Sequence, residues 1–561
     1  MNIGTLPQIL AERATSMGDQ PLYHYMAPKA MQPVTLTYRE LHDYSCNLAA
    51  MLRSLGFEGK KALLMYPPGL DFIKTFFGCM QGNVSAIPMY IPPGNTPDNR
   101  LFAISQTVDI AVTLTVKAKE AQVRSFVDQL FPGKESLIIC TDELPQTGPV
   151  DVDWSIDADL PPLIQFTSGS TSNPKGVVVS HANLVHNQYM IARGFHRHAQ
   201  TRGGEAMVSW LPFFHDMGLI CSIMHPVFIG GSVVLMSPND FLQNPHKWLQ
   251  LISSYSATIS GAPNFAYDYC ATRIKDEQLE GLDLSHWRVA YNGSEMIRPL
   301  TMKKFCDRFA PYGFQKSALF YCYGMAETTL YVSGSTGEVG DSVNADTVAC
   351  VGTPDEKSEV IIVDEDKNVL PDGKPGEIWV RGPHVARGYI NNPQASKRIF
   401  EAKPHNDEAA PSYLRTGDLG YMLNGDLYMV GRAKNLLVVN GKNYFGEEIE
   451  YFVARSNDHF VESGACILQT NEGLENAEIV FMQEIHKSSV DTVRSNLAEL
   501  EERALQLSRK IVSEFKLSVH RFVFLRAGRL PRTSSGKIDR ARAHGLAIDV
   551  GPNCLLDVGV R

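Results

Sequence analysis

The sequence lacks the features that mark several special classes of protein. Its 10 cysteines are scattered, and no two stand at CxxC spacing, so neither a zinc site nor a dense disulfide framework is expected. Basic residues (52) do not outnumber acidic ones (61), and the net charge is −9, so nucleic acid is not an expected partner. There is also no low-complexity tract and no repeat of fixed period.

Long uninterrupted apolar runs are absent as well. Glu12 and Arg13 lie where an export signal would need apolar residues, so the N-terminal stretch indicates an amphipathic helix. Residues 217–239 contain no Asp, Glu, Lys or Arg, but Pro226 and the Gly230–Gly231 pair interrupt them, which favours a buried helix followed by a strand over a transmembrane segment. We therefore expect a cytoplasmic protein with reduced, mostly buried thiols.

The chain of 561 residues is long enough for three or four folding modules. Short apolar runs such as LLMY (63–66) and SVVLM (232–236) alternate with helical patterns, which predicts an α/β fold of stacked, mostly parallel sheets. From about residue 340 the pattern becomes rich in strands and turns, with a hairpin around Pro371–Asp372–Gly373. We expect a large N-terminal domain (1–432) with a small β subdomain (340–432), and a small α/β C-terminal domain (433–561) that includes one long helix, 490–515.

The segment 166–181, FTSGSTSNPKGVVVSH, lies between two apolar strands. Small hydroxyl residues and glycines let successive backbone N–H groups face one concavity, which suits phosphate oxygens, and a lysine adds positive charge. A Walker loop is excluded because GxxxxGK[ST] is absent. The alternative is a flexible surface turn. The predicted phosphate-binding residues are Thr167, Ser168, Gly169, Ser170, Thr171 and Lys175.

The string TSGSTSNPKG resembles the first signature of the adenylate-forming superfamily, which includes acyl-CoA synthetases, luciferases and the adenylation domains of peptide synthetases. The resemblance implies ATP as a substrate, Mg²⁺ as a cofactor and a mobile C-terminal domain.

Two further motifs match the same superfamily. In YCYGMAETT (321–329), the resemblance implies that Tyr323 stacks on adenine beside Gly324 and that Glu327 binds Mg²⁺. The alternative for Glu327 is a carboxylate near a helix start. Asn292 and Gly293 of NGSEMI resemble the edge of the adenine pocket, although the residues alone also fit an ordinary Asn-Gly turn.

Three later positions follow from the same resemblance. Asp418 in YLRTGDLG is expected to accept from the ribose hydroxyls, and Arg432 in GRAKNLL to contact ribose or phosphate. Lys434 stands at the expected hinge, and Lys537 in PRTSSGK is expected to bridge the carboxylate and the α-phosphate during adenylation. A lysine on a loop of this kind is otherwise simply solvated.

FFHDMGL (213–219) is similar to the fatty acyl-AMP ligase branch and implies that His215 lies near the acyl carboxylate. The alternative is a helix cap, with Asp216 capping and His215 packing. The resemblance implies activation of a fatty acid to an acyl adenylate, then transfer to the phosphopantetheine thiol of an acyl carrier protein in polyketide, nonribosomal peptide or lipid biosynthesis.

Two other functions stay open. The fatty acyl-AMP ligase branch has an insertion at the position of residues 334–351, and the corresponding segment here is short. An acyl-CoA synthetase that uses CoA as acceptor is therefore the first alternative. The second alternative is an inactive acyl- or nucleotide-binding module. Such a module would be expected to have lost the charged residues of the motifs, whereas Lys175, Glu327 and Lys537 are all present.

Overall fold

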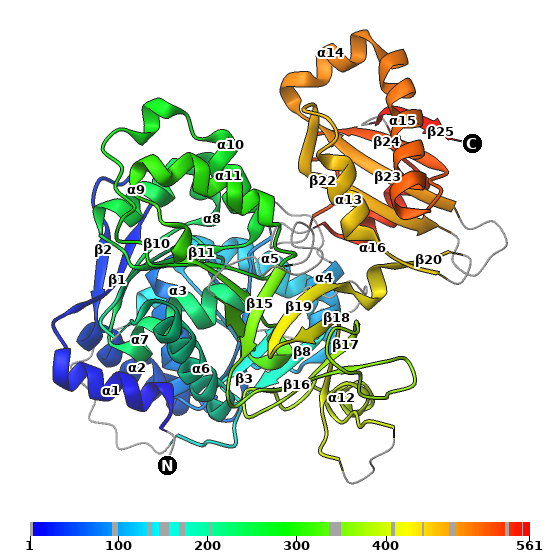
Figure 1. Cartoon of the computed structure of the whole chain (residues 1–561). Helices are drawn as coiled ribbons and strands as arrows, with labels where there is room; N and C mark the ends of the chain where they lie inside the picture. Colours follow the sequence, from blue (N-terminus) through cyan, green and yellow to red (C-terminus); the bar gives the residue numbers. More distant parts are fainter. Residues whose placement is uncertain are drawn as a thin grey trace. The chain divides into compact units, whose positions relative to one another are not determined.

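The computed structural model describes residues 4–92, 99–131, 137–144, 156–167, 174–201, 203–335, 349–405, 410–439, 442–470, 478–532, 538–551 and 554–560. The chain divides into two compact units (Figure 1). The larger takes in residues 1–167, 173–416 and 421–428, and the smaller takes in 417–420 and 429–561.

Two sheets organise the larger unit. In the described residues one sheet has 13 strands, in the spatial order β16 (Glu359–Val363), β17 (Gly376–Arg381), β18 (Leu414–Leu423), β19 (Asp426–Arg432), β15 (Ala349–Pro354), β14 (Ser333–Ser335), β13 (Leu319–Tyr323), β12 (Val289–Asn292), β11 (Ile259–Ala262), β9 (Ala206–Ser209), β10 (Ser232–Met236), β1 (Pro21–Met26) and β2 (Val34–Thr37). The other has the order β6 (Ile138–Cys140), β5 (Val112–Thr115), β3 (Lys61–Met65), β4 (Ser85–Met89), β7 (Leu163–Phe166) and β8 (Gly176–Val179).

Most neighbouring strands in the centre of each sheet are parallel. The strands β9 to β13 pair in parallel, and so do β3 with β4 and with β5. Parallel strands need a crossover, and helices supply it: β3, α3 and β4 follow one another along the chain. The expected α/β class is confirmed. The helices of this unit are α1 (Leu6–Met17), α2 (Tyr38–Ser54), α3 (Leu70–Gln81), α4 (Asn99–Thr107), α5 (Glu120–Leu130), α6 (His181–Ala199), α7 (His225–Ile229), α8 (Pro238–Gln243), α9 (His246–Ser254), α10 (Asn264–Arg273), α11 (Pro299–Phe309) and α12 (Pro393–Phe400).

Two local predictions are confirmed. The charge-poor segment 217–239 forms a π-helix (Met217–Met224), α7 and β10, interrupted at Gly230, which has a φ of 69°. β16 and β17 form an antiparallel hairpin, with Glu359 opposite Arg381.

The smaller unit has its own two-sided core. Its sheet has the order β22 (Phe460–Thr470), β23 (Glu478–Ile485), β24 (Arg521–Arg526), β25 (Cys554–Gly559), with β20 (Leu436–Val439) and β21 (Lys442–Phe445) as a separate pair. Apolar residues of α13 (Gly446–Ala454) and α15 (Leu497–Phe515) pack on one face, while Ala543 and Ala547 of α16 (Arg540–Ile548) pack on the other.

The helix expected over 490–515 is two helices, α14 (Val490–Ser495) and α15. Asn496 separates them, because its backbone leaves the helical region (φ −142°) and its side chain caps the N–H of Glu499. An Asn side chain that bonds the next turn favours a helix start over a helix interior.

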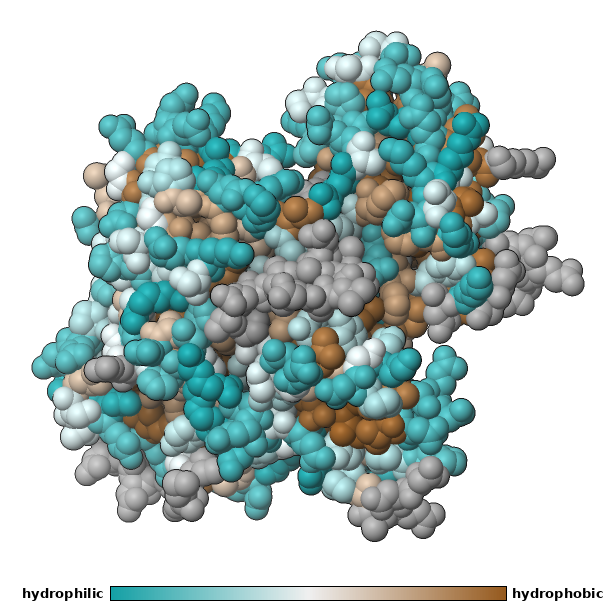
Figure 2. All heavy atoms as spheres, in the orientation of Figure 1, coloured by the Kyte–Doolittle hydropathy of each residue, from teal (hydrophilic) through white to brown (hydrophobic). Residues whose placement is uncertain are grey.

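Hydrophilic residues cover much of the visible surface (Figure 2). Within the described ranges no helix is long and apolar enough to cross a membrane.

A buried histidine lies inside the larger unit. His225, 1% exposed, contacts the Oε1 of Gln188 through Nδ1 at 2.7 Å, and the Nε2 of Gln188 donates to the carbonyl of Ile220 at 2.9 Å. Burial lowers the pKa of His225 from 6.5 to about 3.

We expect acid to destabilise the larger unit partly through His225. Between pH 6.5 and about 3 the unfolded chain binds a proton that the folded chain does not, so stability falls with falling pH by about 1.4 kcal/mol per pH unit. His225→Asn keeps an N–H donor and should flatten the slope by about that amount. All five tryptophans lie before residue 380, so tryptophan fluorescence in urea titrations reports on this unit. The exposed His405→Asn is the control; an unchanged slope in His225→Asn would refute the assignment.

Candidate active site

The loop after β13 carries Glu327 in a tight fold-back of the chain. A Cβ on Gly324 would lie 1.5 Å from the carbonyl oxygen of Leu330, so only glycine permits this approach. The N–H of Val332 donates to the carbonyl of Tyr323 at 2.9 Å and closes the loop. The Glu327 residue is 8% exposed and stands in a short 3₁₀ turn, Ala326–Thr328.

A strained residue follows two positions after Glu327. Thr329 has φ 65° and ψ −63°, and the N–H of Leu330 donates to the carbonyl of Thr328 at 2.7 Å, which makes a γ-turn of the rare positive-φ kind. This conformation is costly for a β-branched residue and persists only where the surroundings impose it. The Thr329 hydroxyl donates to the carbonyl of His384 at 2.7 Å.

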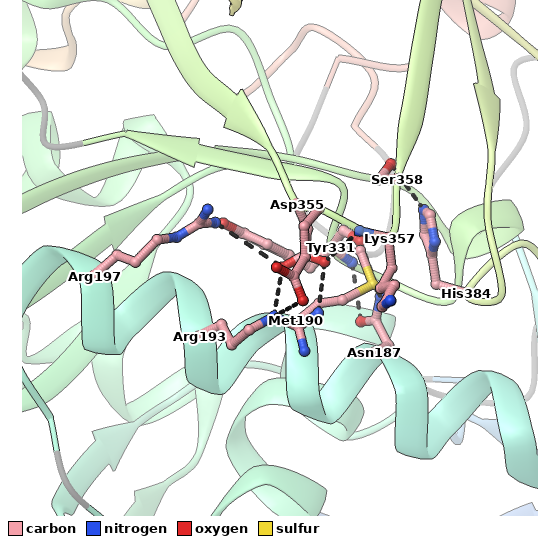
Figure 3. Close-up of polar contacts among 10 residues, drawn as sticks. Asn187, Met190, Arg193, Arg197, Tyr331, Asp355, Lys357, Ser358 and His384 are labelled. Atoms are coloured by element: carbon pink, nitrogen blue, oxygen red, sulfur yellow. Dashed lines mark hydrogen bonds and ion pairs between the residues drawn. The ribbon is translucent and has the colours of Figure 1, made fainter. Parts of the chain in front are cut away.

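Two asparagines on one face of α6 hold the loops around Glu327. The Nδ2 of Asn183 donates to the carbonyls of Pro383 and Val385 at 2.8 and 2.9 Å. One turn later, Asn187 pairs with the backbone of Tyr331: its Nδ2 donates to the carbonyl at 2.9 Å, and its Oδ1 accepts from the N–H at 3.1 Å (Figure 3).

The same helix holds the end of β15 through an ion pair. Arg193 donates to both oxygens of Asp355 at 2.6 and 3.1 Å, and the Asp355 side chain is fully buried (Figure 3). The N–H of Asp355 donates to the carbonyl of Val332 at 3.0 Å. α6 therefore holds the Glu327 loop directly through Asn187 and indirectly through Asp355.

The expected phosphate loop connects two paired strands. β7 and β8 are antiparallel, and the N–H of Thr167 donates to the carbonyl of Lys175 at 3.1 Å. Of the predicted loop residues, Ser168, Gly169, Ser170 and Thr171 lie outside the described residues. α6 begins directly after β8, with Ser180 as its N-cap.

One aromatic ring meets both Lys175 and Glu327. The Nζ of Lys175 lies 4.8 Å from the centre of the Tyr389 ring, and the Tyr389 hydroxyl donates to the Oε1 of Glu327 at 2.7 Å. A cation and a carboxylate from two separate motifs thus lie around a single side chain.

The donor set suits Mg²⁺ bound together with a nucleotide. No group of three or more His, Cys, Asp or Glu side chains is arranged to hold a metal by itself within the described part of the chain. Mg²⁺ typically uses one or two carboxylates plus substrate phosphates, and Glu327 would supply one such carboxylate.

The residues expected around adenine lie at the ends of neighbouring parallel strands, β12 and β13. Tyr323 ends β13 and is 7% exposed, and a Cβ on Gly293 would lie 2.8 Å from the Cys322 sulfur. Asn292 is fully buried, and its Nδ2 lies 3.1 Å from the Met302 sulfur. Within the described residues its Oδ1 has no hydrogen-bond partner.

His215 and Asp216 form a contact of 2.6 Å between Nδ1 and Oδ1. The same Asp216 oxygen accepts from the N–H of Met217 at 2.7 Å, as the capping alternative predicts. The Nε2 of Gln165, on β7, donates to the carbonyl of Phe214 at 2.7 Å, so the strand that enters the phosphate loop also fixes the segment before His215.

The remaining predicted residues belong to the smaller unit. Asp418, whose side chain is 3% exposed, pairs with the Nε of Arg432 at 2.8 Å. Lys434 is exposed on the turn Ala433–Asn435. Lys537 lies outside the described residues.

Sequence reasoning missed the residues that hold the site together: Asn183, Asn187, Thr329 and Tyr389. Thr329 was within a quoted motif, but nothing in the letters indicates a positive φ. The asparagines stand four residues apart in α6, a spacing that places two polar side chains on one helix face and could have drawn attention to them.

Comparison with known proteins identifies the family of the chain. The family model for AMP-binding enzymes matches residues 10–390. The chain therefore belongs to the AMP-binding enzyme family, and the expected relation to adenylate-forming enzymes is confirmed.

Several relatives match nearly the whole chain. The medium-chain-fatty-acid–[acyl-carrier-protein] ligase JamA of Moorena producens is 33% identical, over 96% of this chain and 94% of its own. The protein fadD25 of Mycobacterium tuberculosis, provisionally named a fatty-acid–CoA ligase, is 34% identical over 96% of both chains. The crystal structure of a Legionella pneumophila fatty acyl-adenylate ligase with acyl adenylate and pyrophosphate is 30% identical, covers 99% of this chain and 98% of its own, and superposes with a TM-score of 0.72.

We expect Asn187→Ala to weaken both the fold and the site. The change leaves the buried backbone groups of Tyr331 without their partner, which costs about 1–3 kcal/mol of unfolding free energy. ATP-dependent adenylation should fall with it, because the Glu327 loop loses an anchor. The control is Asn368→Ala, which removes an amide that bonds Asp364 in the distant β16–β17 connection. Equal adenylation rates in Asn187→Ala and the wild type would contradict the role of α6.

Proposed function

We propose that this enzyme activates a fatty acid with ATP to an acyl adenylate, releases pyrophosphate, and transfers the acyl group to the phosphopantetheine thiol of an acyl carrier protein. The observation that carries the proposal is that Lys175 and Glu327 both contact Tyr389, one at the ring and the other at the hydroxyl, because this brings the phosphate motif close to the expected metal carboxylate. Family membership supports adenylation, and JamA supports the acceptor.

The chemistry explains why opposite charges are needed together. A carboxylate is a poor electrophile, and its attack on the α-phosphorus of ATP forms a mixed anhydride and expels pyrophosphate. Both reactants are anionic, so the site must stabilise negative charge that builds up on the α-phosphate. Preorganised donors of this kind are typically worth about 10²- to 10³-fold each in rate, and positioning supplies much of the remainder.

Each predicted residue has a proposed part. Glu327 and the phosphates would hold Mg²⁺, which would neutralise phosphate charge when bound. Lys175 and the loop of Thr167, Ser168, Gly169, Ser170 and Thr171 bind phosphate oxygens, and Lys537 bridges the carboxylate and the α-phosphate. The remaining parts of the nucleotide and the acyl group would be bound by Tyr323, Gly324, Asn292 and Gly293 (adenine), Asp418 and Arg432 (ribose), and His215 (carboxylate).

The domain boundary at 432–433 and the hinge at Lys434 remain a proposal too. One small domain would serve both half-reactions by rotating about the hinge. A disulfide or chemical tether between residues after 433 and the N-terminal domain should then block thiol transfer and spare adenylation, and transfer that continues at the normal rate would argue against the hinge.

A second acceptor is favoured by one relative. fadD25 is provisionally named a CoA ligase, and residues 334–351 are short, so CoA is the alternative thiol.

We expect Lys537→Ala to abolish carboxylate-dependent pyrophosphate release while leaving ATP binding largely intact, because the lysine acts on charge that develops during the reaction. Pyrophosphate release and equilibrium ATP binding measure the two effects. Lys510→Ala, which removes an exposed lysine from α15, is the matched control. Undiminished pyrophosphate release from Lys537→Ala would overturn the assignment.

We expect thioester to form on a holo acyl carrier protein. Fatty acids of several chain lengths are supplied with ATP, followed by either the carrier protein or CoA, and mass spectrometry identifies the product. If acyl-CoA is the main product, CoA replaces the carrier protein as the acceptor. If acyl adenylate forms but neither acceptor is used, only the adenylation half of the proposal stands.

A further inference from the structure

Tyr389 lies between the two charged groups of the proposed site, although no motif pointed to it. Its residue is 8% exposed, its hydroxyl donates to the Oε1 of Glu327 at 2.7 Å, and the Nζ of Lys175 lies 4.8 Å from its ring centre. The hydroxyl and the ring face therefore serve different partners.

The backbone of Tyr389 is fixed to the strand that leaves the phosphate loop. Tyr389 forms an antiparallel bridge with Val177, and the N–H of Ile390 donates to the carbonyl of Gly176 at 2.8 Å. The N–H of Tyr389 donates to the hydroxyl of Ser396 on α12 at 2.9 Å. The backbone of Tyr389 is thus held against β8, next to Lys175.

The Glu327 loop is tied to the same stretch of chain. The N–H of Ala386 donates to the carbonyl of Glu327 at 2.9 Å, three residues before Tyr389. The backbone and the carboxylate of Glu327 are therefore both held from the segment 386–389.

The hydroxyl is a permanent donor. A carboxylate oxygen only accepts, so the Tyr389 phenol supplies the proton of this hydrogen bond. A donor on one carboxylate oxygen limits rotation of the carboxylate plane, as partners of metal ligands commonly do.

We propose that Tyr389 is a positioning residue that couples the phosphate-loop lysine to the metal-binding carboxylate: its hydroxyl orients Glu327, and its ring holds the ammonium of Lys175 near the phosphates. The inference rests on the proposed roles of Glu327 and Lys175. It adds a residue that sets the spacing between the two.

Two substitutions separate the two contacts. Tyr389→Phe removes the donor and keeps the ring, so the affinity for Mn²⁺ in the presence of a non-hydrolysable ATP analogue should fall about tenfold, while metal-free binding of the analogue should stay within about twofold. Tyr389→Leu also removes the ring, and metal-free binding should then weaken about threefold to tenfold as well. Electron spin resonance of Mn²⁺ and calorimetry of the analogue give the two affinities.

The chain offers a matched control. The Tyr413 hydroxyl donates to Glu359, and the guanidinium of Arg381 lies 5.7 Å from the Tyr413 ring centre, so a tyrosine again contacts a carboxylate and a cation, here without any predicted site residue. Tyr413→Phe should leave both affinities unchanged. Thermal unfolding of each variant shows whether the fold is kept.

The outcomes separate this inference from the proposed function. Wild-type Mn²⁺ affinity in a folded Tyr389→Phe variant overturns the inference and leaves adenylation standing. A tenfold loss of Mn²⁺ affinity in Tyr389→Phe, together with no acyl adenylate from any fatty acid in the wild-type enzyme, supports the coupling and overturns the proposed function. No binding of Mn²⁺ and analogue by the wild type overturns both.

Discussion

The backbone of the Glu327 loop stays in an unfavourable conformation because its neighbours hold it there. Thr329 stands in a positive-φ γ-turn. The backbone at Gly324 lies so close to the carbonyl oxygen of Leu330 that there is no room for a side chain. Asn187, the carbonyl of His384 and the N–H of Ala386 bind the loop from different sides. The strain is local, whereas the bonds that oppose it come from α6 and the 384–386 segment, so the carboxylate position depends on the surrounding fold.

The helix α6 connects the Glu327 loop to the rest of the larger unit. It follows the phosphate-loop hairpin without a break, because Ser180 caps it directly after β8. Its buried amides replace the water that the loop carbonyls would otherwise bind, and a buried amide left unpaired would be costly. The helix thus acts as a rigid rod between the phosphate segment at its start and the end of β15, where Arg193 binds Asp355.

The fold class and the motifs could be predicted from the sequence, whereas the contacts that build the site could not. Alternating apolar runs gave the strands and crossover helices, since period and length are local properties. Local properties also explain the error at 490–515, where Asn496 ends one helix and caps the next. By contrast, Tyr389 and Glu327 are 62 positions apart, and Asn187 and Tyr331 are 144 apart, so their contacts depend on tertiary packing that no local pattern encodes. Lys175 and Glu327 were each predicted as site residues, but their shared contact with Tyr389 was not.

The smaller unit buries apolar side chains on both faces of its own four-stranded sheet, with α13 and α15 on one side and α16 on the other. A segment that closes its own interior has little need of foreign side chains to fold. Homologous chains can therefore exchange this unit as one piece, and we expect recombination breakpoints after the end of β19 at Arg432 to yield folded hybrids more often than breakpoints within either hydrophobic interior.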